Sequence, residues 1–157
     1  EPTDGLDPNQ KFQVRELIGE MSKDKAIVIS THLLEEVDAV CNRAVVIARG
    51  AKVADGTPAD LERRSRYYNS VSVHLKTDRV DQLKSAVERI EHVSGVELGP
   101  VVDDVTQVLV VPMDGSEIVE AVNLQLVENN IPAEQIYVER GRLDDVFRQI
   151  TSEGDAQ

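Results

Sequence analysis

The chain has 157 residues, enough for one ordinary domain or two small ones. Hydrophobic residues make up 41% and charged residues 29%, as in globular proteins, and no apolar run approaches the roughly 20 residues that span a bilayer. The net charge of −12 disfavours binding to nucleic acid or to anionic lipid. A single cysteine excludes an internal disulfide. The three histidines lie far apart in the sequence, so no metal site is expected.

Charge divides the chain into two parts. Residues 1–68 hold 10 basic and 12 acidic residues, whereas residues 69–157 hold 7 and 17. The change falls at the polar stretch 63–70, which is predicted to be a linker or a helix end. We therefore expect two domains, residues 1–66 and residues 67–157.

The first domain opens with a turn-rich segment. Asp7 is a good helix cap, and Pro8 suits the first helical position, so a helix is predicted from Pro8 to about Ser22. The apolar run 26–30 is typical of a strand buried on both faces, as in a parallel sheet.

Further elements continue this pattern to the end of the first domain. Thr31 is predicted to cap a second helix, and residues 44–48 are predicted to form a second buried strand. Residues 53–56 are expected to pair back on that strand as a hairpin, before a short helix capped by Thr57. The order helix, strand, helix, strand, hairpin is that of the second half of an α/β sheet domain.

The second domain has a different pattern. Apolar residues alternate with polar ones along the predicted strands and recur at helical spacing in the predicted helices. Asp103-Asp104 is predicted to be a turn between two of the strands. The order β-α-β-β-α-β predicts a ferredoxin-like α+β domain, followed by one more helix. The strands are predicted at 71–76, from 96, 107–111 and 135–139, and the helices at 80–90, 118–127 and 143–150.

Several motifs of the first domain occur together at a specific spacing. With these motifs, residues 1–66 resemble the ATPase subunit of ATP-binding cassette (ABC) transporters. The tail 142–147 resembles the C-terminal extension of a subgroup whose permeases are of the ABC-2 export type. The motifs of the first domain are Glu1-Pro2-Thr3-Asp4-Gly5-Leu6-Asp7-Pro8, Ile29-Ser30-Thr31-His32, Glu35-Glu36-Val37 and Asp55-Gly56-Thr57-Pro58.

The resemblance implies catalytic roles for Glu1 and His32. Glu1 matches the glutamate that ends the Walker B strand and polarises the attacking water. His32 matches the switch histidine that contacts the γ-phosphate of ATP. A third matching segment, the D-loop, crosses the dimer interface and couples the two ATP sites; it consists of Asp4, Gly5, Leu6 and Asp7.

The same resemblance implies the fold, cofactors, partners and location of the parent protein, the longer protein of which this chain would be a part. Its fold would be a P-loop ATPase domain, of which residues 1–66 are the C-terminal half. Its cofactors would be ATP and Mg²⁺, and its partners a second ATPase subunit and a transmembrane permease. It would act in the cytoplasm, at the inner face of the cell membrane. Permeases contact the transported substrate, so that substrate cannot be read from this sequence.

This chain also departs from the family pattern. A phosphate-binding loop needs a Gly-Lys pair, and neither this pair nor a Leu-Ser-Gly-Gly signature occurs in the sequence. We therefore expect the 157-residue chain to be a fragment that neither binds ATP tightly nor hydrolyses it, with no cofactor bound. An exposed apolar edge at residues 26–30 predicts self-association, or exchange of elements between copies.

Simpler interpretations accompany these hypotheses. Glu1 alone is an ordinary terminal residue, and Ser30-Thr31-His32 alone is a helix cap beside a surface histidine. The second domain fits either an interaction module or a ligand-sensing module. The whole chain also fits a small, non-enzymatic α/β regulatory protein.

Overall fold

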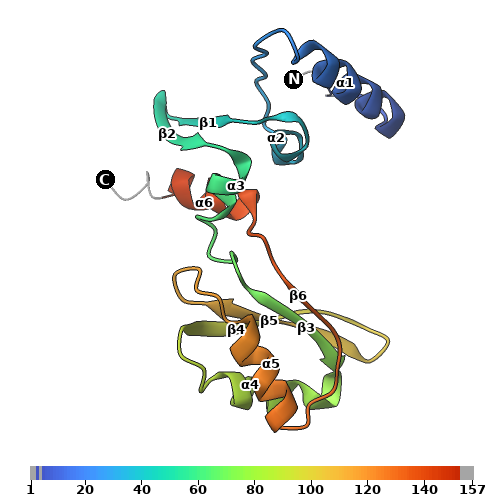
Figure 1. The fold of residues 1–157 in the computed structure, drawn as a ribbon, viewed down its shortest axis with the longest axis vertical. Helices are drawn as coiled ribbons and strands as arrows, with labels where there is room; N and C mark the ends of the chain where they lie inside the picture. The colour runs from blue at the N-terminus through green and yellow to red at the C-terminus, as the bar shows by residue number, and fades with distance from the viewer. Residues whose placement is uncertain (1–2, 4, 153–157) are drawn as a thin grey trace. The chain divides into compact units, whose positions relative to one another are not determined.

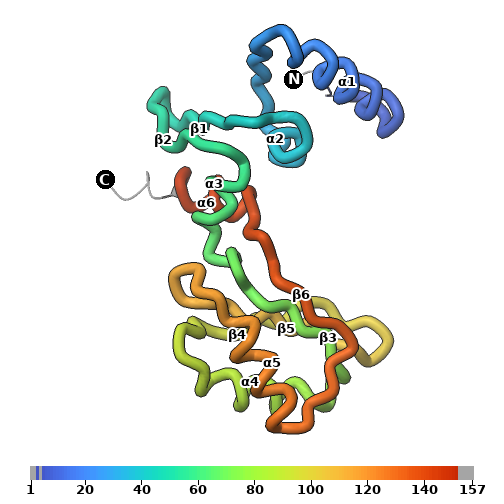
Figure 2. The backbone as a smooth tube through the Cα atoms, in the orientation of Figure 1, coloured from blue at the N-terminus to red at the C-terminus, as the bar shows by residue number. Residues whose placement is uncertain are grey.

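The computed structural model describes residue 3 and residues 5–152 (Figures 1 and 2). The chain is mixed α/β, with two antiparallel sheets. It divides into two compact units between Leu61 and Glu62, and each unit is described by itself. No helix in the described part of the chain is both long and apolar enough to cross a membrane.

The first unit begins with the predicted helix, α1 (Pro8–Met21). Asp7 caps it as expected, because its carboxylate accepts hydrogen bonds from the N–H groups of Asn9 and Gln10. Gln10 bonds back to the Asp7 N–H, which completes a capping box. The cap satisfies N–H groups that a helix leaves open at its start.

The prediction of a buried strand at residues 26–30 is wrong. The segment lies outside any sheet, and the Val28 side chain is 96% exposed. A strand buried on both faces needs neighbouring strands and covering helices. Within residues 3 and 5–61, the structure provides one two-stranded sheet, and neither of its strands pairs with this segment.

The second helix, α2 (Leu34–Val40), follows His32 closely. The prediction that Thr31 caps this helix is wrong: the cap residue is Leu33, without a side-chain capping bond. Thr31 instead accepts a hydrogen bond from the Leu33 N–H at 3.0 Å, just before the helix begins. The apolar side chains of α2 are only half-buried, and its one fully buried residue is Glu36.

The predicted hairpin is present. β1 (Ala44–Ala48) pairs antiparallel with β2 (Ala51–Gly56), and α3 (Pro58–Glu62) follows. β1 is not buried on both faces as predicted: its side chains alternate between half-buried and exposed, since only one strand lies beside it and a two-stranded ribbon cannot enclose it.

The second unit is built on a four-stranded antiparallel sheet with the order β4-β5-β3-β6. Two helices, α4 and α5, lie side by side on one of its faces (Figure 1). Its elements follow the order β-α-β-β-α-β-α, with a short 3₁₀ turn η1 before α4. Their bounds are β3 Val71–Lys76, η1 Thr77–Arg79, α4 Val80–Val87, β4 Val93–Val102, β5 Val105–Pro112, α5 Val119–Glu128, β6 Ala133–Val138 and α6 Leu143–Ser152.

The register of this sheet follows from its turns. Asp103 and Asp104 form the predicted turn between β4 and β5, both with positive φ, as in two-residue hairpins of type I′. β3 pairs with β5 on one side and β6 on the other, and the backbone trace shows these three strands running side by side (Figure 2).

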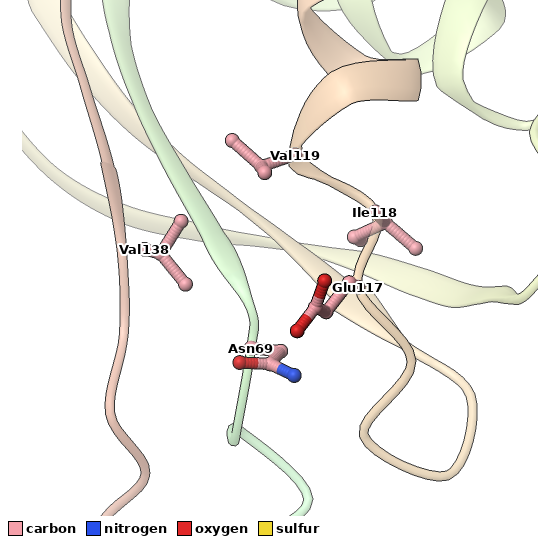
Figure 3. A pocket seen from close by; sticks show the side chains of 5 residues that line it. All are labelled: Asn69, Glu117, Ile118, Val119 and Val138. Carbon is pink, nitrogen blue, oxygen red and sulfur yellow. The ribbon is translucent and has the colours of Figure 1, made fainter.

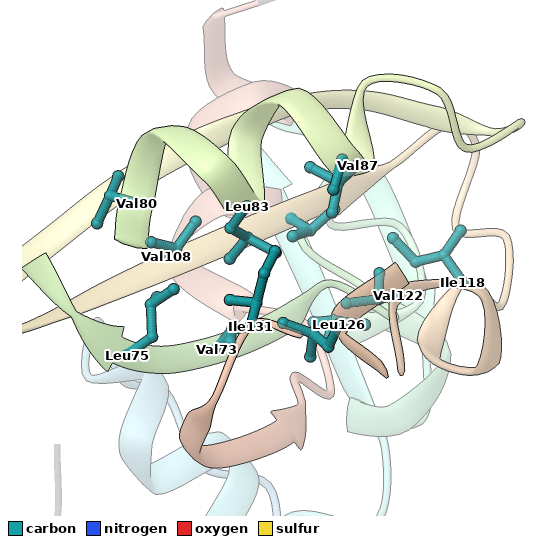
Figure 4. Close-up of a cluster of buried hydrophobic side chains, with 13 residues drawn as sticks. Val73, Leu75, Val80, Leu83, Val87, Val108, Ile118, Val122, Leu126 and Ile131 are labelled. Carbon is teal, nitrogen blue, oxygen red and sulfur yellow. The ribbon is translucent and has the colours of Figure 1, made fainter. Parts of the chain in front are cut away.

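The core of the second unit lies between the sheet and the two helices. Figure 4 shows Leu83 of α4 and Leu126 of α5 directed toward Val73 and Val108 of the sheet. Burying one such side chain contributes about 1.5–3 kcal/mol relative to leaving it exposed. The core is aliphatic, as the low aromatic content requires.

The stretch that sequence suggested as a linker or helix end is packed. Ser65, Tyr67 and Ser70 are buried. Asp145 of α6 accepts hydrogen bonds from the Ser65 hydroxyl at 2.8 Å and the Arg66 N–H at 3.1 Å. These bonds fix α6 to the residues that lead into β3.

Candidate functional site

The candidate site begins with the segment before α1. The Leu6 N–H donates to the Thr3 carbonyl at 3.3 Å and closes a tight turn. Gly5 has φ +71°, the left-handed conformation that glycine adopts at low energetic cost. Glu1 and Asp4, two of the predicted site residues, lie outside the described residues.

The other end of this segment is fixed by α1. Asp7 is exposed, but its carboxylate caps the helix at 2.9 Å from the Asn9 nitrogen and 3.0 Å from the Gln10 nitrogen. Leu6, beside it, is half-buried. The Asp7 side chain is therefore oriented toward the helix N-terminus.

Thr3 connects the opening segment to a distant part of the sequence. Its hydroxyl donates a hydrogen bond to Oε1 of Glu36, 33 residues further along the chain. Both side chains are buried, at 1% relative exposure each. A carboxylate removed from water is strongly destabilising unless it is paired or hydrogen-bonded, so the Thr3 hydroxyl is a needed partner for Glu36.

Two ion pairs bring α1 and α2 together. Lys11 Nζ lies 3.5 Å from Oε1 of Glu35, and an Arg15 guanidinium nitrogen lies 4.0 Å from Oε1 of Glu36. The Lys11 pair has an exposed carboxylate and is weak, whereas the second ion pair shares the buried Glu36 oxygen with Thr3. Glu36 is thus the point at which the opening segment, α1 and α2 meet.

His32 lies two residues before α2, and its side chain is exposed. The sequence predicted a buried strand just before His32, but residues 26–30 form no strand. The position of His32 is set instead by the turn at Thr31 and by the start of α2. The opening segment reaches the same helix through Glu36, one turn after His32.

Thr3 and Glu36 lie within the motifs of the first domain, but the sequence alone assigned neither residue a role. A signal for Glu36 was present. The sequence predicts apolar residues on the buried side of the helix after Thr31, and Glu36 lies at helical spacing from two of them, Leu33 and Val40. A carboxylate inside an apolar stripe indicates a buried, paired acid.

Burial raises the pKa of the nearby Cys41 thiol, and the negative charge of Glu36 raises it further.

Surface pockets occur in the described part of the second unit. One, of about 220 Å³, lies between β6 and the start of α5, and Figure 3 shows Glu117 and Asn69 at one end of it and Val119 and Val138 at the other. The Asn69 amide already donates to the Gly115 carbonyl at 2.8 Å. Another pocket, of about 400 Å³, lies beside α4 and β4. No three His, Cys, Asp or Glu side chains among the described residues gather closely enough to hold a metal ion.

Known proteins are similar to this chain over part of its length. Nod factor export ATP-binding protein I of Paraburkholderia xenovorans (strain LB400) is 39% identical over 62 residues, which cover 39% of this chain and 20% of that protein. The protein of the same name from Burkholderia pseudomallei (strain 1710b) is 33% identical over 111 residues, 66% of this chain and 35% of that protein.

A eukaryotic relative is also found. ABC transporter A family member 1 of Dictyostelium discoideum is 27% identical over 88 residues, 56% of this chain and 10% of that protein. The chain thus spans between about a tenth and about a third of the length of these relatives. No protein-family model matches the chain.

Proposed function

Because the curated homologues of this chain are ABC transporter ATP-binding proteins, matched over part of the chain, we propose that its first unit is part of an ATPase domain that couples ATP hydrolysis to export through a membrane permease. In this proposal Glu1 polarises the attacking water and His32 contacts the γ-phosphate. Asp4, Gly5, Leu6 and Asp7 form the loop that couples two ATPase subunits.

The observation that carries this proposal is the buried hydrogen bond between Thr3 and Glu36. It holds the opening segment against the helix that begins just after His32. Two motifs far apart in sequence therefore meet in the fold, as residues of one nucleotide site must. Phosphoryl transfer depends mainly on positioning and charge stabilisation, which such a contact can supply.

The remaining parts of the proposed site come from elsewhere in the full-length protein. ATP and Mg²⁺ would be the cofactors there, held by a phosphate-binding loop that this sequence lacks. A second ATPase subunit would complete the site across a dimer interface. The transmembrane permease would anchor both subunits at the inner face of the cell membrane.

ATP hydrolysis by the full-length protein, reconstituted with its permease in lipid, tests this function. Glu1→Gln and His32→Ala are each expected to lower kcat at least 100-fold while ATP still binds. His92→Ala, in the second unit, is the matched control and should leave kcat within 2-fold of wild type. Wild-type turnover by both Glu1→Gln and His32→Ala would refute the proposal.

The 157-residue chain by itself is proposed to be inactive. Without a Gly-Lys pair it has no loop whose N–H groups can surround the phosphates. Isothermal titration with Mg-ATP should detect no binding at micromolar nucleotide. A micromolar Kd accompanied by hydrolysis would contradict this.

Exposed apolar side chains of the first unit support a proposal of self-association. Val28 is 96% exposed and Ile47 is 67% exposed. In the parent protein the rest of the ATPase domain would cover them, and in the isolated chain a second copy can do so. Light scattering should show a mass that rises with concentration; a monomer at high concentration would exclude self-association.

We propose that the second unit is a ferredoxin-like accessory domain that acts as an interaction module. Its β-α-β-β-α-β order and its β4-β5-β3-β6 sheet support this fold. The apolar pocket of Figure 3, at about 220 Å³, is smaller than most small-molecule sites. The pocket beside α4 and β4, at about 400 Å³, is within their range and is where the ligand-sensing alternative would place its ligand. A thermal-shift screen with metabolites should give no stabilisation, whereas a stabilising metabolite would favour the ligand-sensing alternative.

A further inference from the structure

Glu36 is the most deeply buried acidic residue among those that the structure describes in the first unit, and the proposed function gives it no role. Its relative exposure is 1%, whereas the neighbouring Glu35 carries a side chain that is 66% exposed. The two residues have the same chemistry and adjacent positions on α2. The fold therefore treats one carboxylate as an internal group and the other as a surface group.

The partners of Glu36 lie in the opening segment and in α1. Thr3 donates its hydroxyl to Glu36, and Arg15 approaches the same oxygen at 4.0 Å. The Arg15 Nε is itself buried and has no hydrogen-bond partner among the described residues. The Thr3 hydroxyl is thus the closest stabilising group for this carboxylate.

Thr3 occupies a critical place in the opening segment. It lies two residues after Glu1 and immediately before Asp4. Its carbonyl closes the turn through Gly5 to Leu6, so the side chain of Thr3 is bonded to α2 while its backbone shapes the turn. Movement of Thr3 would disturb this turn to Leu6.

We propose that Glu36 is a positioning residue of the ATP site, and this inference rests on the proposed function. Its buried carboxylate holds Thr3 and thereby fixes the segment that carries Glu1 and the D-loop. The helix that carries Glu36 begins just after His32, so this one carboxylate fixes the opening segment relative to the segment that contains His32. Glu36 touches no substrate and acts through Thr3.

Steady-state ATP hydrolysis by the full-length protein with its permease tests the inference. Glu36→Ala is expected to lower kcat about 10-fold to 100-fold and to change KM for ATP less than 3-fold, because it disturbs the geometry of the reaction and not the phosphate-binding loop. Glu36→Gln keeps an oxygen that accepts the Thr3 hydrogen bond and should restore kcat to within about 3-fold of wild type. Glu35→Ala, the matched control, should change kcat less than 2-fold.

Changes at Thr3 separate positioning from simple loss of folding. Thr3→Val should reproduce the kcat loss of Glu36→Ala, whereas Thr3→Ser should stay near wild type. The double variant Thr3→Val/Glu36→Ala should be no slower than either single variant, because both remove one contact. Losses that multiply in the double variant, or a Glu36→Ala kcat within 2-fold of wild type, would overturn the inference.

Glu1→Gln is measured in the same series. If Glu1→Gln abolishes hydrolysis while Glu36→Ala does not alter it, the positioning role fails and the proposed function stands. If Glu1→Gln hydrolyses ATP at the wild-type rate, the proposed function fails and the role of Glu36 at that site falls with it.

Discussion

The two units bury their side chains in different ways. The second unit has a continuous aliphatic core beneath α4 and α5, whereas the buried hydrophobic residues of the first unit are Ala54 and Leu61, among the described residues. The first unit instead buries a hydrogen-bonded pair, Thr3 and Glu36. A unit held by its own core can specify its fold alone, while one that exposes apolar side chains and buries polar ones depends on other surfaces.

The largest expected effect tests this contrast directly with two matched leucines. Leu83→Ala, at a fully buried position of the second unit, should lower the free energy of unfolding by about 3 kcal/mol, because it leaves a cavity. Leu17→Ala, at a half-exposed position of α1, should lower it by less than about 0.5 kcal/mol. Urea denaturation followed by circular dichroism measures both.

Equal effects of the two leucine variants would show that α1 packs in solution in a way that the structure does not contain. The first unit would then have a buried apolar core of its own, and the contrast between the two units would not hold. A loss at Leu17 that appears only at high protein concentration would instead identify a second copy as its cover.

Two glycines should respond to alanine with opposite signs. Gly141 has φ +106°, and a Cβ added there would lie 2.3 Å from the Glu62 carbonyl oxygen, so Gly141→Ala should destabilise the second unit by about 2–3 kcal/mol. Gly19, inside α1, has open space around it, and Gly19→Ala should stabilise the helix by about 0.5–1 kcal/mol. Thermal unfolding curves check both signs, and a neutral Gly141→Ala would mean that the segment before α6 can move away from Glu62.

Asp144 and Asp145 form a matched pair on α6. Asp145 is buried and accepts hydrogen bonds from Ser65, Arg66 and Gln149, so Asp145→Ala should destabilise the second unit by about 2 kcal/mol. Asp144 pairs only with Arg148 at the surface among the described residues, and Asp144→Ala should change stability by less than about 0.5 kcal/mol.

Hydrogen exchange at the Arg66 amide gives the Asp145 prediction a local readout. Loss of Asp145 removes the acceptor of that N–H, so its protection should fall in Asp145→Ala and stay unchanged in Asp144→Ala. Retained protection in Asp145→Ala would mean that the residues before β3 are held by other contacts, such as the stacking of Arg66 and Arg142 on Tyr67.

Sequence predicted the second unit better than the first for a physical reason. The alternation in Val71–Lys76 and the helical spacing of Val80, Leu83 and Val87 report contacts that the chain makes with itself, and these elements are present. The run 26–30 has the composition of a buried strand, but strand formation also needs neighbours, and the described residues supply none. Local pattern thus predicts an element only where its partners are in the same chain.

The candidate site shows the same division. The cap at Asp7 is a local property and was predicted from Asp7-Pro8 alone. The contact of Thr3 with Glu36 joins residues 33 positions apart, and no local pattern specifies such a pair. The sequence did not assign Glu36 a role, and the fold identified both its burial and its partner.

The smallest expected effect concerns a charge at the surface of the first unit. Arg43 at 2.8 Å and Lys52 at 3.0 Å bond to the Asp55 carboxylate of the hairpin and hold the pKa of Asp55 down at about 2. A lowered pKa in the folded state stabilises the hairpin above the ordinary Asp pKa of about 3.9, and this contribution disappears as the pH falls toward 2. In Arg43→Ala, NMR titration should show the Asp55 pKa rising toward its ordinary value, with a further rise when Lys52→Ala is added. An Asp55 pKa that is unchanged in Arg43→Ala would contradict this prediction and would mean that the exposed ion pair does not persist in solution.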